Sequence, residues 1–207
     1  HLITKPVFEA LFENYSFVKN NPMSKSMQQM LDLLEEQTLE KDRETLEKFY
    51  ESVRQRVEGI DNAEGKQRVI IELYDRFFKT AFPRVVERLG IVYTPVEVVD
   101  FIINSVDDVL KKEFDRTLSD ENIHILDPFT GTGTFITELI EYLPKDKLKQ
   151  KYQEEIHCNE VAILPYYIAH LNIEYTHAQK MGEYEAFNNI CFVDTLDNTI
   201  YQGKQYD

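Results

Sequence analysis

The chain has 207 residues, enough for one large domain or two small ones, and 43% of them are hydrophobic, which supports a packed core. Its formal net charge of −14 predicts a surface that repels nucleic acid over most of its area. No apolar run approaches the roughly 20 residues of a membrane-spanning helix and no signal peptide is visible, so we expect a cytoplasmic protein without a membrane partner.

The first part of the chain, residues 1–90, has the pattern of an all-helical segment. Met27, Met30 and Leu34 recur at helical spacing after the break at Asn21-Pro22. Further apolar stripes of this kind follow, with charged residues on the opposite faces, which is typical of helices that pack on one side and face solvent on the other. We assign no chemistry to this segment.

A helix with strong start signals is predicted after residue 93. Thr94 is a favourable N-cap, Pro95 suits the first helical position, and Glu97 would complete a capping box. Apolar residues then recur at helical spacing as far as Leu110. Taken alone, this pattern indicates a well-capped helix and nothing more.

The most informative stretch joins a short strand to a helix through two glycines. The apolar run Ile123–Leu126 has the length of a buried strand and is followed by Asp127. Gly131 and Gly133 come next, and apolar residues recur at helical spacing from Phe135 onward. Strand, glycine turn and helix form the first unit of a nucleotide-binding α/β sheet, in which the ligand lies beyond the carboxyl end of the strand.

The glycine stretch lacks the features that bind a pyrophosphate. A dinucleotide fingerprint has a third glycine where this chain has Ile136, and a Gly-Lys-Ser/Thr phosphate loop occurs nowhere. No basic residue lies between Asp127 and Leu143. The acid would repel a pyrophosphate, but it suits a ligand with an ammonium group, such as the methionine part of S-adenosylmethionine. An ordinary strand-to-helix turn is the alternative.

The nonapeptide Asp127–Phe135, Asp-Pro-Phe-Thr-Gly-Thr-Gly-Thr-Phe, resembles the cofactor motif of adenine-N6 DNA methyltransferases. This resemblance implies an α/β fold, a partial Rossmann-like sheet of the kind that binds S-adenosylmethionine, preceded by the all-helical segment. In methyltransferases of the γ arrangement, a helix that starts with Tyr-Thr-Pro precedes the glycine loop and faces the methionine carboxylate. The resemblance implies cofactor contacts at Tyr93, Thr94, Asp127, Pro128, Phe129, Thr130, Gly131, Thr132, Gly133 and Phe135.

Two later strands are also predicted to end in acids. The second, predicted from the run that starts at Tyr152, ends in Glu160. The Glu160 carboxylate would accept hydrogen bonds from both ribose hydroxyls of a bound adenosine, and Val161 would pack on the adenine. The third ends in Asp194, which in the resembled family accepts the exocyclic amine of adenine, and Thr195 and Leu196 complete this part of the expected site. One strand-end acid is usually a solvated loop residue, but three with helices between them favour a cofactor site.

The two cysteines point to no separate chemistry. Cys158 and Cys191 both lie in apolar strand-like runs. We expect reduced core residues of a cytosolic protein, and we predict neither a disulfide nor a metal site.

The resemblance covers nearly the whole chain and narrows to single-polypeptide restriction–modification enzymes of the type ISP group. The runs Ile71–Phe78 and Glu87–Pro95 resemble the segment that precedes their methyltransferase, and His1–Phe8 and Ala63–Ile70 are similar to their helical coupler. In that group the coupler links a nuclease and an ATP-driven motor to the methyltransferase. The resemblance therefore implies these two domains and DNA as partners in a longer parent protein.

The expected domains are a coupler-like segment at 1–90 and the N-terminal part of a methyltransferase at 91–207. Adenine-N6 transfer needs an Asn/Asp-Pro-Pro-Tyr/Phe loop, which binds the target amine and stacks on the flipped base. The chain has seven prolines and no two are adjacent, so we assign it no catalytic residue. It also begins at His1 in a helix-like pattern, and we expect a piece of a longer protein whose transfer loop and DNA-recognition region lie elsewhere.

Two other functions stay open at this point. A degenerate cofactor fold could serve only as a coupler or docking module, and the same fold could methylate RNA or protein. In the expected sheet the first strand has the other two on one side and an unpaired edge on its other side. Such an edge tends to pair with another chain, so we expect either self-association or coverage of the edge by the helical segment.

The missing transfer loop gives a direct prediction. The purified chain of 207 residues should incorporate no labelled methyl group from S-adenosylmethionine into DNA of any sequence, because nothing in it can hold a flipped adenine. A radiolabel assay on mixed-sequence DNA measures this. Robust incorporation by the pure chain would refute this interpretation of the sequence.

Overall fold

The computed structural model describes residues 21–34, 94–197, 200–201 and 204–205, and the single positions 51, 55, 65 and 69. The chain forms two compact units, His1–Val86 and Glu87–Asp207. The domain limits expected from the sequence stay a proposal. Tyr93, the coupler-like runs and most of the expected helices before residue 90 lie outside the described residues.

In the first unit, the structure describes one helix in full, α3 (Pro22–Leu34). Asn21 caps it, because its Oδ1 accepts a hydrogen bond from the Ser24 N–H at 3.0 Å. Proline is favourable in the first turn, where its missing N–H would have had no partner within the helix. The helix predicted after the Asn21-Pro22 break is therefore confirmed.

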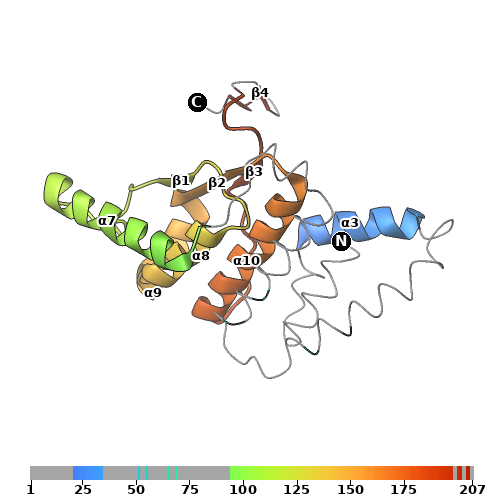
Figure 1. The fold of residues 1–207 in the computed structure, drawn as a ribbon, viewed down its shortest axis with the longest axis horizontal. Coiled ribbons are helices and arrows are strands. Elements are labelled where there is room, and N and C mark those ends of the chain that lie inside the picture. Colours follow the sequence, from blue (N-terminus) through green and yellow to red (C-terminus); the bar gives the residue numbers. More distant parts are fainter. Residues whose placement is uncertain are drawn as a thin grey trace. The chain divides into compact units, whose positions relative to one another are not determined.

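The second unit contains a parallel sheet of three strands, in the order β1-β2-β3 (Figure 1). The strands are β1 (Ile125–Asp127), β2 (Ile156–Glu160) and β3 (Ile190–Phe192). Helices separate them along the chain, as the sequence predicts for an α/β fold. The other elements of this unit are α7 (Val96–Phe114), α8 (Thr134–Tyr142), α9 (Lys145–Gln150), the π-helical turn η1 (Lys151–Glu155), α10 (Ile163–Met181), β4 (Ile200–Tyr201) and β5 (Lys204–Gln205).

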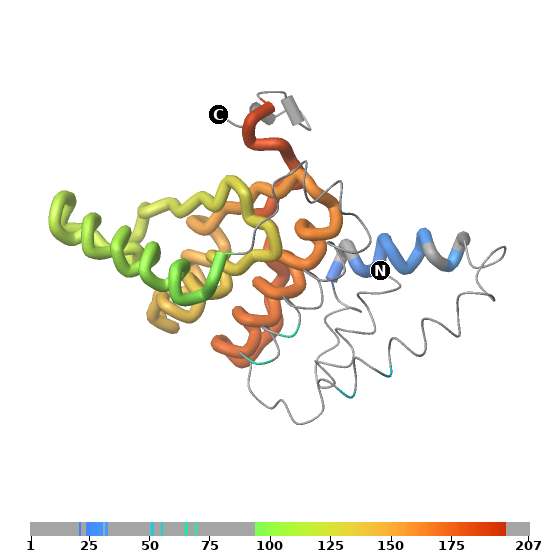
Figure 2. The backbone as a smooth tube through the Cα atoms, viewed as in Figure 1, coloured from blue at the N-terminus to red at the C-terminus, as the bar shows by residue number. Residues whose placement is uncertain are grey.

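The helices α7 to α10 lie on one face of this sheet, with α8 between α7 and α10 (Figures 1 and 2). Their apolar side chains form one core with the strand residues that point to that face. Ile156 and Cys158 are buried in this core, whereas Leu126, on the opposite face of β1, is 53% exposed. The alternation is the one expected for side chains along a strand. The core therefore fixes which side of each strand faces the helices.

All three predicted strands are present, but their limits differ from the sequence prediction. The first begins at Ile125 instead of Ile123, whose carbonyl accepts a hydrogen bond from Lys151 Nζ at 2.9 Å. The second begins only at Ile156, because the residues before it form η1. The third ends at Phe192, so Asp194 lies two residues beyond the strand.

A buried ion pair in η1 fixes the start of β1. Lys151 and Glu155 are 2% and 3% exposed and form an ion pair with each other. Glu155 Oε1 also accepts the Asn122 N–H at 2.7 Å, and Lys151 holds the carbonyl oxygens of Asp120 and Ile123. These contacts hold the residues before β2 in the helical turn η1. If those residues were extended, Lys151 and Glu155 would separate and each would be a buried charge without compensation.

Strand β1 lies at an edge of the sheet formed by the described residues. It pairs with β2 on one side and with no other described strand, and β2 pairs with β3. The expected order, with the second and third strands on one side of the first, is therefore confirmed. Self-association through the edge of β1, or coverage of that edge by the helical segment, stays a prediction.

Two glycines at the start of α8 allow a test of this packing. Gly131 and Gly133 have φ angles of 58° and 88°, in the left-handed region. A Cβ on Gly133 would lie 3.3 Å from both Ala169 Cα and Ile173 Cγ1, whereas one on Gly131 would have nothing within 4 Å. Alanine at either position carries a backbone cost of roughly 1–2 kcal/mol. Only Gly133→Ala adds overpacking against α10, which typically costs about 1–3 kcal/mol more.

We therefore expect Gly133→Ala to lower the free energy of unfolding clearly more than Gly131→Ala. Chemical denaturation of the two variants and the unchanged protein measures the difference. Equal losses would show that α8 and α10 do not approach each other as closely as described.

Candidate functional site

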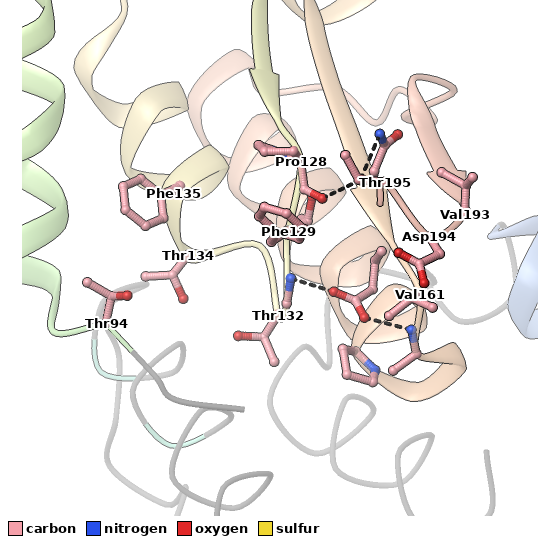
Figure 3. Close-up of a pocket in the computed structure, with 16 residues that line it drawn as sticks. Thr94, Pro128, Phe129, Thr132, Thr134, Phe135, Val161, Val193, Asp194 and Thr195 are labelled. Atoms are coloured by element: carbon pink, nitrogen blue, oxygen red, sulfur yellow. Dashed lines mark hydrogen bonds between the residues drawn. The ribbon is translucent and has the colours of Figure 1, made fainter. Parts of the chain in front are cut away.

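A pocket of about 280 Å³ lies beyond the carboxyl ends of the three parallel strands (Figure 3). Three segments form most of it: the glycine loop (128–133), the β2 turn (160–162) and the β3 turn (193–196). They meet because parallel strands end at the same edge of their sheet. The pocket is lined by Thr94, Pro128, Phe129, Thr130, Gly131, Thr132, Thr134, Phe135, Asn159, Glu160, Val161, Ala162, Pro165, Val193, Asp194 and Thr195.

Neighbouring elements hold the glycine loop through its backbone. The Thr130 N–H donates to the Asn159 carbonyl oxygen at 2.9 Å, and the Gly131 N–H donates to Glu160 Oε2 at 2.8 Å. Asn172, buried in α10, donates from Nδ2 to the Thr132 carbonyl oxygen at 2.9 Å. The loop therefore has a defined path although it contains two glycines.

The Glu160 carboxylate connects the glycine loop to the β2 turn. Its second oxygen, Oε1, accepts the Ala162 N–H at 2.7 Å. The side chain is largely buried, and this burial raises the pKa of Glu160, while the hydrogen bonds from Ala162 and Gly131 oppose the shift. A carboxylate has about four acceptor positions, so two N–H donors leave capacity for hydroxyl groups of a ligand.

Asp127 lies beneath the glycine loop and is not among the lining residues. Its Oδ1 accepts the Phe129 N–H at 3.2 Å, and its Oδ2 is buried without a hydrogen-bond partner in the described part of the chain. Burial raises the pKa of Asp127, and the nearby Glu160 charge raises it further. A buried carboxylate oxygen without a partner is costly, so this position favours a proton or a cationic ligand group.

The β3 turn carries the third acid. Asp194 is half-buried, lines the pocket, and accepts the Leu196 N–H at its Oδ1 at 3.0 Å. Thr195 donates from Oγ1 to the Pro128 carbonyl oxygen at 2.6 Å, which connects this turn to the glycine loop. Leu196 is not among the lining residues and is 82% exposed.

The capping box predicted at Thr94 is wrong. Helix α7 begins at Val96, and Pro95 (φ −58°, ψ 142°) is its N-cap without any side-chain cap. The N–H groups of Val98 and Val99 donate to the Pro95 carbonyl oxygen at 3.0 and 3.1 Å. Because the cap is Pro95, Thr94 lies one position too early for its hydroxyl to cap the helix. Its side chain lines the pocket instead, across from the β3 turn (Figure 3).

The structure brings most of the predicted site residues together. Asp127, Gly133 and Leu196 do not line the pocket, and Tyr93 lies outside the described residues. Sequence reasoning missed five lining residues, of which Asn159 and Ala162 flank the predicted pair at the end of β2. Their position next to Glu160 and Val161 was the signal that could have identified Asn159 and Ala162. The missed lining residues are Thr134, Asn159, Ala162, Pro165 and Val193.

The two cysteines lie in the sheet, as predicted. Cys158 and Cys191 are free thiols in β2 and β3, and burial raises the pKa of Cys158. Within residues 94–197 and the other described positions, no group of three or more His, Cys, Asp or Glu side chains could hold a metal ion. No described helix is long and apolar enough to span a membrane.

Comparison with protein-family models identifies both parts of the chain. Residues 66–206 match the N-6 DNA methylase family, and residues 1–65 match the coupler domain of Type ISP restriction-modification enzymes. The chain belongs to the N-6 DNA methylase family. The predicted Rossmann-like methyltransferase fold and the resemblance to the type ISP group are therefore confirmed. Comparison with curated proteins found no match.

Solved structures of large enzymes resemble this N-6 DNA methylase chain over most of its length. A cryo-EM structure of a DrdV–DNA complex is 47% identical with a TM-score of 0.87, and covers 96% of this chain and 20% of its own. The ATP-dependent Type ISP enzyme LlaBIII bound to DNA is 49% identical with a TM-score of 0.80. The match covers 100% of this chain and 14% of the LlaBIII chain. A nuclease-deletion mutant of the Type ISP enzyme LlaGI, in complex with a DNA substrate mimic, is 47% identical with a TM-score of 0.77. The match covers 98% of this chain and 17% of the LlaGI chain. The chain thus spans a fifth or less of these proteins.

The raised pKa of Asp127 predicts a specific dependence of stability on pH. A carboxyl group whose folded pKa exceeds its unfolded value, about 3.9, contributes stability that is complete below that value. The contribution is lost as the pH rises through the raised folded pKa. We therefore expect Asp127→Asn to match the unchanged protein near pH 4 and to be the more stable of the two at pH 7, in the absence of ligand.

Denaturation with urea at both pH values measures this difference. Asp108→Asn, at an exposed position in α7, controls for the loss of one negative charge. A stability difference for Asp127→Asn that does not change with pH would show that this carboxyl group is not perturbed by its burial.

Proposed function

We propose that the pocket binds S-adenosylmethionine, and that the chain is the cofactor-binding part of an adenine-N6 DNA methyltransferase within a restriction–modification enzyme. The observation that supports this proposal is the convergence of acids on one site. Glu160 and Asp194 line the pocket, and Asp127 lies under its glycine loop. None of the described lining residues is a lysine or an arginine, so the site suits a cation and not a pyrophosphate.

The residues present fit the separate parts of this cofactor. Glu160 retains acceptor positions for the two ribose hydroxyls, and Asp194 would accept a hydrogen bond from the amine of adenine. Val161, 45% exposed, offers an apolar surface to the adenine ring. Asp127, with its unpartnered oxygen, would compensate the methionine ammonium.

The negatively charged carboxylate of the methionine part would bind at the other end of the pocket. The start of α7 presents backbone N–H groups and the positive end of the helix dipole, and Thr94 beside it lines the pocket. A carboxylate placed there would lie near donors, while the ammonium lies near an acid. The two ends of the site thus have opposite polarities, as the two groups of an amino acid require.

Bound S-adenosylmethionine supplies a methyl group on a positively charged sulfur. The described residues bind and orient it, and the buried acids stabilise its charge. The glycine loop allows backbone to approach the ligand closely, because the space beside Gly131 is open. The residues that would receive the target adenine are not assigned to this chain.

We further propose that the parent protein is a cytoplasmic enzyme that acts on DNA through regions outside these 207 residues. Two observations support action on DNA through other regions. The similar structures are described as complexes with DNA or a DNA substrate mimic, and this chain covers only 14–20% of them. Its own net charge of −14 is unfavourable for DNA contact over most of its surface. From the similarity to Type ISP enzymes we also propose that a nuclease domain and an ATP-driven motor domain are partners of the coupler.

Replacement of Glu160 tests the proposed site. Glu160→Ala removes the acceptor for the ribose hydroxyls and releases two backbone N–H groups of the loops. Hydrogen bonds to a charged group are worth roughly 1.5–3 kcal/mol each, so we expect the affinity for S-adenosylhomocysteine, the demethylated product, to fall by about tenfold or more. Isothermal titration calorimetry measures it.

Glu154→Ala is the matched control, since Glu154 is exposed in η1 and does not line the pocket. Its affinity should equal that of the unchanged protein. Equal losses from the two variants would mean that Glu160 makes no specific contribution to cofactor binding.

A further inference from the structure

Asn159 connects two sides of the pocket through a short chain of hydrogen bonds. Its Nδ2 donates to Thr195 Oγ1 at 3.2 Å, and Thr195 Oγ1 donates to the Pro128 carbonyl oxygen at 2.6 Å (Figure 3). The backbone carbonyl oxygen of Asn159 accepts the Thr130 N–H at 2.9 Å. We name this set of contacts the Asn159–Thr195 clip. It joins the end of β2, the β3 turn and the glycine loop.

The hydrogen bonds from the Asn159 amide to the Thr195 hydroxyl and on to the Pro128 carbonyl can run in one direction only. The Thr195 hydroxyl has one proton, which it donates to Pro128, so it can only accept from Asn159. Asn159 supplies an amide N–H for this purpose and is itself 8% exposed. Its position is fixed by β2, where it lies opposite Cys191 of β3. The buried amide thus orients an exposed hydroxyl on the neighbouring turn.

The clip also sets the separation of two segments that face each other across the pocket. The β3 turn carries Asp194, and the glycine loop carries Phe129 and Thr130; all three line the pocket. Apart from the Asn159–Thr195 clip, the contact of the β3 turn with β2 includes the Val193 N–H bond to the Glu160 carbonyl oxygen at 3.1 Å. Without the clip, the β3 turn would keep the Val193 hydrogen bond to β2 and lose the Thr195 hydrogen bond to the glycine loop.

We propose that Asn159 is a positioning residue, which preforms the pocket by holding the β3 turn against the glycine loop. This inference rests on the proposed function, because it concerns the same cofactor site. A preformed site binds more tightly, because less conformational freedom is lost on binding. Asn159 therefore raises cofactor affinity by acting through Thr195, without having to touch the ligand.

A double-mutant cycle tests this proposal. S-adenosylhomocysteine is titrated by calorimetry into the unchanged protein, Asn159→Ala, Thr195→Val and the double variant. We expect each single variant to bind about three- to tenfold more weakly, the range for loss of a neutral hydrogen bond. The double variant should bind little more weakly than either, because both changes break the same connection. Thr195→Ser keeps the hydroxyl and should bind nearly as well as the unchanged protein.

Asn189→Ala is the matched control for loss of an asparagine amide. Asn189 precedes β3, at the opposite end of the sheet from the pocket, and donates to the carbonyl oxygens of Tyr152 and Gln153 at 3.2 and 2.9 Å. We expect it to lower the melting temperature and leave the affinity unchanged. Melting temperatures of all variants show which are folded, and the exposed Thr195 keeps the test valid if Asn159→Ala does not fold.

The outcomes separate this proposal from the one on which it rests. If the unchanged protein does not bind the cofactor product, the proposed function fails and the role of Asn159 fails with it. If it binds, but the single variants bind equally well or their losses simply add, the cofactor site stands and the clip is overturned. The clip is likewise overturned if Asn189→Ala weakens binding as much as Asn159→Ala.

Discussion

The pocket depends on one buried carboxylate, that of Glu160, which holds two segments of backbone at once. One oxygen accepts the Gly131 N–H from the glycine loop, and the other accepts the Ala162 N–H before α10. The sheet brings these segments together, since the strands that precede them end at the same edge. The carboxylate then fixes them, so one side chain contributes to both the shape and the negative charge of the site.

That arrangement has an electrostatic cost. Asp127 and Glu160 are both withdrawn from water, and the pKa of Asp127 is raised by burial and then by the nearby Glu160 charge. Among the lining residues that the structure describes, no cationic side chain relieves this negative charge. A ligand that brings an ammonium and a sulfonium would supply the missing positive charge. This electrostatic cost would favour a cationic ligand over an anionic one.

The sequence predicts this fold and site wherever the signal is local. The alternation of strands and helices, the glycine turn and the acids that follow the strands are visible over a few residues each, as at Asp127 and Glu160. The cap of α7 was mispredicted because Thr94, Pro95 and Glu97 fit a capping box in sequence, while the backbone conformation of Pro95 makes it the cap. Local pattern cannot decide between two adjacent cap positions.

Contacts between distant residues could not be predicted. Lys180 caps α8 by donating to the carbonyl oxygens of Ile140 and Leu143 at 2.8 and 2.7 Å, across some forty residues of chain. Asn159 and Thr195 are separated by 36 residues and meet only after the strands pair. Such pairings follow from register, which a single sequence does not specify. They decide how the loops are held, whereas the strand-end acids decide what the loops can bind.

Hydrogen–deuterium exchange with and without S-adenosylhomocysteine is the sharpest test of the cofactor site, because it locates the ligand on the chain. We expect slower amide exchange in three separate segments, the glycine loop, the β2 turn and the β3 turn, with little change in α9. Protection confined to other segments, or no protection at saturating ligand, would contradict a cofactor site at the ends of these strands.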